Sequence, residues 1–168
     1  PSVVIGYTDG KYTGDRSQRV YGKDNGSRQK VYFIFGSHRA FAWSTDMQNW
    51  TTFTNNINDD TKCQALFKSA FDWAAKGDSS YGWSGNLWAP DVIWNEQMNK
   101  WCMYMSINGK SWNSSIVLLT SDSLNGDWEN QGTVVYSGFT KSGVHAYTDT
   151  DFASVVGSDN ADAALVRF

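Results

Sequence analysis

Short apolar segments, separated by Gly, Asn, Asp and Ser, recur along most of the chain. They are rich in β-branched and aromatic side chains, which is typical of β-strands. Because they are apolar almost throughout rather than strictly alternating, they indicate strands covered on both faces, as in stacked sheets. The clearest of them are Val31–Gly36, Ala40–Ser44, Trp101–Ser106, Ile116–Thr120 and Thr133–Tyr136.

One stretch has the periodicity of a helix instead. Between Ala65 and Ala75 the apolar residues recur at the spacing that places them on one face of a helix. These residues are Leu66, Phe67, Ala70, Phe71 and Ala74. We therefore expect one short helix inserted between two β units.

The strands form two similar units. Each has an aromatic strand, a return strand and a Ser/Asp turn that ends in Trp, over Tyr32–Trp50 and over Cys102–Trp128. The corresponding turn residues, Asp46 and Asp122, lie 76 positions apart. The repetition is typical of propeller blades. Two blades cannot close a ring, since propellers have about four to eight, so we expect the remaining blades in another segment, chain or copy.

Length and charge narrow the class of protein. A chain of 168 residues fits one domain. Its 14 Lys and Arg against 17 Asp and Glu argue against a nucleic-acid partner, because phosphate-backbone binding needs a basic surface. No apolar run reaches the length of a membrane helix, so no membrane partner is expected. The chain starts at Pro1 without a leader, from which we expect a processed or excised piece of a soluble protein.

Cysteine, histidine and motif content exclude several chemistries. Two His and two Cys without close spacing argue against a zinc site, so we expect neither metal nor cofactor. The phosphate-loop pattern GxxxxGK[ST] and the serine-hydrolase pattern GxSxG are both absent. Cys63 and Cys102 could form one disulfide, but the sequence does not determine their distance. Nine Trp and eight Tyr leave two interpretations, core packing or outward rings that stack against sugars.

Three motifs together resemble glycoside hydrolase family 43, in particular its arabinanase-like members. They are Phe35–Ile57 (FGSHRAFAWSTDMQNWTTFTNNI), Asn86–Val92 (NLWAPDV) and Val135–Thr140 (VYSGFT). The resemblance covers roughly residues 20 to 140 and implies an all-β, five-bladed propeller, of which this chain holds about two blades and one short inserted helix. We expect a first blade at about 20–57, the helical insertion at about 58–86, a second blade at about 87–140 and the start of a third at about 160–168.

The resemblance also implies three catalytic carboxylates. The general base is an Asp in a His-Asp-Pro triplet, and an ungapped match places Gly22 at that Asp. Asp24 lies two residues further and could serve as the base, although Lys23–Gly26 also reads as an ordinary solvated turn. Asp162 matches the Asp that orients the general acid, with a plain loop Asp as the alternative. The general acid itself is a Glu expected beyond Phe168.

Four residues are candidates for substrate binding. Asp91 lies in the second motif, where its carboxylate either faces the pocket or binds backbone donors. Trp88 either stacks against a sugar ring or fills the propeller axis. His38, at the inner turn of a blade, either hydrogen bonds with a sugar hydroxyl or is a satisfied turn residue. Trp43 is a weaker candidate, since packing is the simpler interpretation.

These features lead to a functional hypothesis. The chain is expected to be a segment of a glycoside hydrolase that acts on arabinan or a related plant cell-wall pentose polysaccharide by inverting acid–base hydrolysis, with the general acid absent from the chain. The alternative is a non-catalytic carbohydrate-binding propeller fragment that has lost the base, and a third option is a purely structural half-propeller. The substrate class implies a secreted or cell-surface protein.

Overall fold

The computed structural model describes residues 1–109, 113–139 and 163–166. Nine strands and two α-helices are arranged along these residues, with short 3-10 turns at Ser37–Arg39 (η1) and Trp83–Gly85 (η2). In chain order the other elements are β1 (Ser2–Thr8), β2 (Gln29–Gly36), β3 (Ala40–Ser44), β4 (Thr51–Thr52), α1 (Asp60–Leu66), α2 (Lys68–Ala74), β5 (Leu87–Asn95), β6 (Lys100–Ile107), β7 (Ser115–Ser121), β8 (Glu129–Phe139) and β9 (Ala163–Val166).

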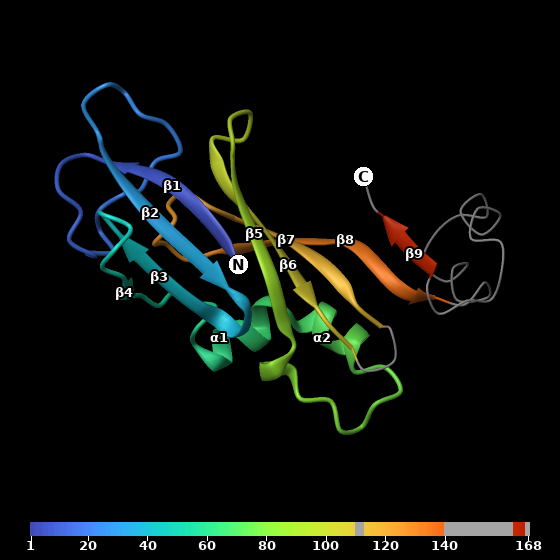
Figure 1. Ribbon diagram of the computed structural model, residues 1–168. Helices are drawn as coiled ribbons and strands as arrows, with labels where there is room; N and C mark the ends of the chain where they lie inside the picture. The colour runs from blue at the N-terminus through green and yellow to red at the C-terminus, as the bar shows by residue number, and fades with distance from the viewer. Residues whose placement is uncertain (110–112, 140–162, 167–168) are drawn as a thin grey trace.

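The strands form two antiparallel sheets, in the orders β1-β2-β3-β4 and β5-β6-β7-β8-β9. Figure 1 shows the sheets next to each other, with β1 of the first beside β5 of the second and the helices at one end. Each sheet has its strands in sequence order, as a propeller blade does. The predicted all-β fold of about two blades is confirmed.

The first sheet contains a strand that the sequence pattern missed. Strand β1 pairs with β2 along its whole length, from Ser2 opposite Phe35 to Thr8 opposite Gln29. Its residues alternate between buried positions, such as Val4, and more exposed ones, such as Val3 and Ile5. Only one face of β1 therefore contributes to the core. The sheet therefore begins well before residue 20. The predicted limits of the blades are not tested by these contacts and stay predictions.

The chain after the first sheet forms two short helices rather than one. Helix α1 begins at Asp60, earlier than expected, because the carboxylate of Asp59 accepts a hydrogen bond from the backbone N–H of Lys62 at 2.9 Å. At Phe67 the backbone leaves helical geometry, with φ −106° and ψ 15°, and α2 follows. The predicted apolar face holds in α2, where Ala70, Phe71 and Ala74 are buried.

The core lies between the two sheets. Inward-facing aromatic rings of the first sheet meet the second sheet, as in the edge-to-face contact of Phe35 with Trp128 at 6.0 Å between centroids. The indole N–H of buried Trp101 donates to the carbonyl oxygen of Val20 at 2.9 Å, which joins β6 to the loop after β1. Cys63 and Cys102 are buried and free, and burial raises the pKa of Cys63 to about 11.

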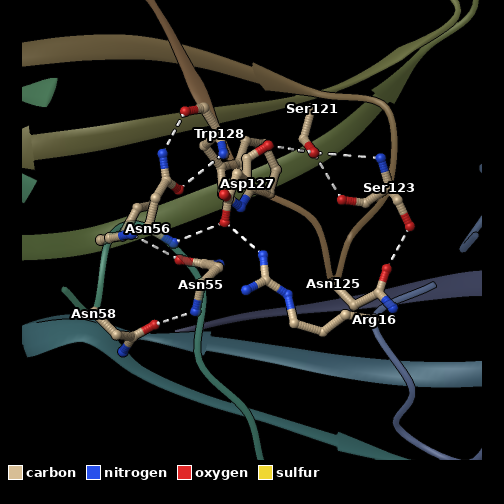
Figure 2. A network of polar contacts seen from close by, with 10 residues as sticks. Arg16, Asn55, Asn56, Asn58, Ser121, Ser123, Asn125, Asp127 and Trp128 are labelled. Carbon is tan, nitrogen blue, oxygen red and sulfur yellow. Dashed lines mark hydrogen bonds and ion pairs between the residues drawn. The ribbon is translucent and has the colours of Figure 1, made fainter. Parts of the chain in front are cut away.

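A polar network joins the blades at their outer edge (Figure 2). The side-chain amide of Asn56 donates to the carbonyl oxygen of Trp128 at 2.8 Å and accepts from its N–H at 2.9 Å. The backbone N–H of Asn56 donates to Asp127, which also pairs with Arg16. Asn56 follows β4 of the first sheet, and Trp128 precedes β8 of the second. Because the strands of the two sheets do not pair with each other, the side chain of Asn56 supplies hydrogen bonds that connect them.

Replacing Asn56 by alanine is expected to lower the free energy of unfolding by about 1–3 kcal/mol, because it leaves two backbone groups of a buried residue without a partner. Asn56→Asp is expected to be at least as harmful, since a carboxylate cannot donate to the carbonyl of Trp128. Urea unfolding measures both. Gln97→Ala, at an exposed position of the β5–β6 turn, is the control and should change stability little.

Strand β9 is the last strand that the structure describes. Strand β9 pairs with β8, with Val135 opposite Val166, and is the fifth strand of the second sheet. This pairing does not test the predicted start of a third blade at about 160–168, which stays a prediction. Within the described ranges, neither helix has the length and apolar character needed to cross a membrane.

Candidate functional site

The inner edges of the two sheets meet through their first strands. The hydroxyl of Ser2, at the start of β1, donates to Oδ1 of Asp91 at 3.1 Å and accepts from the N–H of Val92 at 3.2 Å. In the turn after β2, the hydroxyl of Ser37 accepts from the N–H of Ala89 at 3.0 Å. Two serines of the first blade thus hold the start of β5 in the second.

Two of the predicted sugar-binding residues come together at this junction. The rings of His38 and Trp88 lie edge to face, with their centroids 4.4 Å apart and their planes at 70°. Trp88 is 41% exposed, which is high for so large an apolar side chain. Asp91, three residues further along β5, is also exposed. We call Ser2, Ser37, His38, Trp88 and Asp91 the inner-strand cluster.

The backbone around the inner-strand cluster is irregular. Between Trp88, opposite Ser106, and Asp91, opposite Tyr104, β5 has one residue more than β6, which is a β-bulge. Ala89 within the bulge has φ +43°, and His38 has φ +56°. Such left-handed conformations cost residues other than glycine roughly 1–3 kcal/mol and concentrate at functional sites. The bulge turns Trp88 and Asp91 to the same face of the sheet, which regular alternation over three residues would not.

Asp24 lies elsewhere. It belongs to the exposed loop between β1 and β2, where its carboxylate accepts a hydrogen bond from the N–H of Gly26 at 3.0 Å in a tight turn. This loop joins the Thr8 end of β1 to the Gln29 end of β2, whereas His38 follows the other end of β2. A strand of this length separates the two ends by about 20 Å. The structure therefore does not bring Asp24 to the inner-strand cluster.

The other predicted residues are not in the cluster either. Trp43 is half-buried on β3, and its ring packs edge to face on Tyr12 at 4.8 Å, as expected for a packing residue. Asp162 lies outside the described residues. Gly22, which the ungapped match places at the general base, lies in the loop after β1 and not on the inner strand. Since glycine has no side chain that could accept a proton, the ungapped match does not identify a general base.

Sequence reasoning missed the two serines of the inner-strand cluster. Ser37 lies in the FGSH motif and could have been noticed there, but Ser2 has no sequence signal beyond preceding an apolar run. Within the ranges that the structure describes, no group of three or more His, Cys, Asp or Glu residues could hold a metal ion.

Two neighbouring four- to five-stranded sheets whose first strands meet define part of a β-propeller. No family model matches the chain. It is 28% identical over 132 residues to the extracellular endo-α-(1→5)-L-arabinanase 2 of Bacillus subtilis (strain 168), which covers 75% of this chain and 26% of that protein. It is 24% identical over 112 residues to the corresponding enzyme of Thermotoga petrophila, covering 64% and 22%.

Solved structures agree with these relatives. The family 43 glycoside hydrolase YxiA protein from Bacillus licheniformis matches with a TM-score of 0.53 and 34% identity, over 70% of this chain and 25% of that one. The endo-1,5-α-L-arabinanase of T. petrophila matches with a TM-score of 0.55 and 25% identity, over 67% and 25%. The resemblance is thus confirmed: this chain is a partial, arabinanase-like propeller of glycoside hydrolase family 43. It spans about a quarter of the length of these relatives.

Proposed function

We propose that this chain is a segment of a glycoside hydrolase that acts on arabinan or a related pentose polysaccharide by inverting acid–base hydrolysis. The observation that carries the proposal is the inner-strand cluster, where an exposed indole, an imidazole and a carboxylate lie at the meeting edges of two blades. The names of the two curated relatives, both arabinanases, support arabinan as the substrate.

Each residue of the cluster has a distinct role in this proposal. The exposed ring of Trp88 offers an apolar face to a sugar ring, and His38 fixes its orientation by the edge contact. The imidazole of His38 also hydrogen bonds with a sugar hydroxyl. Asp91 accepts hydroxyl hydrogen bonds, while the hydroxyl of Ser2 holds its carboxylate in place. These contacts bind and orient the sugar and leave proton transfer to other groups.

Inverting hydrolysis needs a pair of carboxyl groups about 6.5–9.5 Å apart, so that a water molecule fits between the base and the sugar. The base removes a proton from this water as it attacks the anomeric carbon, and the acid donates a proton to the departing oxygen. In our proposal the acid comes from residues outside this chain. Asp162 as the orienting carboxylate and Asp24 as the base remain predictions, and the position of Asp24 lends its role no support.

The outer faces of the sheets support a partner made of further blades. Val3 and Ile5 on β1 are 57% and 44% exposed, and Ile93 on β5 is 58% exposed. These β-branched side chains stand on faces that the other sheet does not cover, as expected for blades that pack against neighbours. We propose that blades from another segment, chain or copy cover them. The extracellular names of both relatives support secretion.

Binding of linear arabino-oligosaccharides, measured by calorimetry, tests the proposed sugar site. Trp88→Ala is expected to weaken binding about tenfold or more, because it removes the stacking surface. Asp91→Asn is expected to weaken it several-fold through the lost charged acceptor. Trp50→Ala, at the turn after β3, is the matched control and should bind as the unmodified chain does. Equal affinity of the Trp88 variant and the control contradicts the proposed site.

Reducing-sugar release from linear arabinan separates the hydrolase from its alternative, a carbohydrate-binding fragment that has lost the base. The contacts of the inner-strand cluster include one carboxylate, that of Asp91, whereas inverting hydrolysis needs two, and this observation favours the alternative. The proposal expects the chain alone to bind without hydrolysis and to hydrolyse arabinan once the remaining blades are supplied. Binding that never leads to hydrolysis in the completed propeller supports the alternative.

A further inference from the structure

A hollow lies at the end of the inner strands away from the inner-strand cluster. It has a volume of about 330 Å³ and is formed between the loop after β1 and the β5–β6 turn. Trp94 in its wall follows Trp88 by six residues along β5, a distance of roughly 20 Å. We call it the basic hollow, and its charged and aromatic lining residues are Arg19, Tyr21, Lys23, Arg28, Trp94 and Glu96.

Arg28 is held in a fixed position in the basic hollow. Its guanidinium lies over the ring of Tyr21, 3.4 Å from the centroid, and its side chain is only 17% exposed. Nε donates to Oδ1 of Asp9 at 2.9 Å, and Nη1 donates to the carbonyl oxygen of Lys23 at 2.9 Å. The hydrogen bond from Arg28 lowers the pKa of Asp9. An arginine ordered in this way loses little conformational entropy when it binds a ligand.

Arg19 supplies positive charge that the hollow does not neutralise. Its guanidinium lies 5.1 Å from the centroid of the same Tyr21 ring, and its Nε donates to a backbone carbonyl, that of Asp122, rather than to a carboxylate. Lys23 pairs with Glu96 at 2.9 Å, and Arg28 pairs with Asp9. Three cations against two carboxylates leave one positive charge, which suits a monovalent anion.

The uncharged lining suits a sugar rather than a simple ion. The amide of Asn99 can donate to and accept from hydroxyl groups, and the indole of Trp94 adds an apolar wall. The volume is close to the lower end of known ligand pockets, about 300 Å³, and is large enough for one sugar ring. The guanidinium of arginine forms bidentate hydrogen bonds with carboxylates and phosphates, and a carboxylate carried by a sugar ring suits both the arginines and the uncharged lining.

We propose that the basic hollow is a second carbohydrate-binding site, which binds the carboxylate of a uronate through Arg19 and Arg28. The site goes beyond the proposed hydrolase activity, since its ligand is an acidic sugar and its residues are distinct from the inner-strand cluster. It would hold the protein on a polysaccharide that carries uronic acids while the inner-strand cluster binds a neutral pentose chain.

Nuclear magnetic resonance titration of the protein with sodium galacturonate, galactose and inorganic phosphate tests the site. Galacturonate and galactose differ in the carboxylate at C6, so galacturonate is expected to shift the indole N–H signal of Trp94 and the N–H signals of residues 19–28, while galactose does not. Arg19→Gln is expected to weaken galacturonate binding about tenfold, the effect of one charge-assisted hydrogen bond. Lys62→Gln, which removes one positive charge from exposed α1, is the matched control and should leave binding unchanged.

Three results overturn the proposal: equal binding of galactose and galacturonate, unchanged affinity in Arg19→Gln, or tighter binding of phosphate than of galacturonate, which would indicate an inorganic anion site. Arabino-oligosaccharide added to the same samples is expected to shift signals at Trp88 and not at Trp94. The experiment therefore distinguishes failure of the proposed uronate site in the basic hollow from failure of the proposed sugar site at the inner-strand cluster.

Discussion

Replacing Gly22 by aspartate is expected to destabilise the protein strongly and to add no catalytic base. A Cβ at this position would lie 1.9 Å from Cδ2 and 2.1 Å from Cγ of the Trp94 indole. The indole also packs edge to face on the ring of buried Trp101, with 5.3 Å between the centroids, so moving it away from Gly22 would disturb this contact. Gly22 is thus explained by the close approach of the backbone to an aromatic face.

The expected loss in the free energy of unfolding is about 3 kcal/mol or more for Gly22→Asp, at the upper end of typical overpacking costs. Thermal unfolding should show it as a melting temperature lower by roughly 6 °C or more. Gly22→Ala should have a similar effect, since the clash begins at Cβ. Gly82→Ala is the matched control, because a Cβ there meets nothing within 4 Å and should leave stability nearly unchanged. Unchanged stability in Gly22→Ala would falsify this account.

Truncation of Phe35 is expected to have the largest effect on stability in the core. Its side chain has no exposed surface and contacts the rings of Phe41 at 5.0 Å, Phe53 at 5.9 Å and Trp128 at 6.0 Å. Phe35→Ala removes the ring that joins the first sheet to Trp128 of the second and leaves a cavity between the blades. The expected cost is about 3–5 kcal/mol, a large share of the roughly 5–15 kcal/mol that stabilises a typical domain.

Urea unfolding followed by tryptophan fluorescence measures this cost. If Phe35→Ala does not fold, Phe35→Leu keeps the test open, because it retains most of the apolar volume and should cost clearly less. Ile5→Ala removes an apolar side chain that is 44% exposed and is expected to cost under about 1 kcal/mol. A loss in Phe35→Ala as small as that of Ile5→Ala contradicts a shared core between the blades.

Local patterns were enough to predict strands β2, β3, β6, β7 and β8, but not β1. The apolar, aromatic and β-branched runs at Val31–Gly36, Ala40–Ser44 and Trp101–Ser106 lie within β2, β3 and β6. Burial on the inner face and strand propensity favour the same conformation in these runs, so the sequence signal is strong. The helix was recognised by its apolar face but its start was not, because the first turn of α1 is polar and is defined by the cap at Asp59.

Residues that act only through distant partners could not be predicted in this way. The ungapped match places Gly22 at the general base by counting along the chain, and this stays a prediction; only the structure shows that Gly22 lies in the long loop between β1 and β2. The role of Ser2 depends on Asp91, which is 89 positions away in sequence. The basic hollow likewise combines a loop of the first blade with a turn of the second.

The sequence by itself determined the class of elements, the repeated blade and the motifs of the family 43 resemblance, because these depend on side-chain types at short spacing. The tertiary structure alone decided which side chains share a site, because that depends on strand register, on the bulge at Ala89 and on the contact between β1 and β5. A hydrogen bond or a ring contact between blades needs positions fixed to within about an ångström. Packing of the two sheets supplies that precision, and local propensity does not.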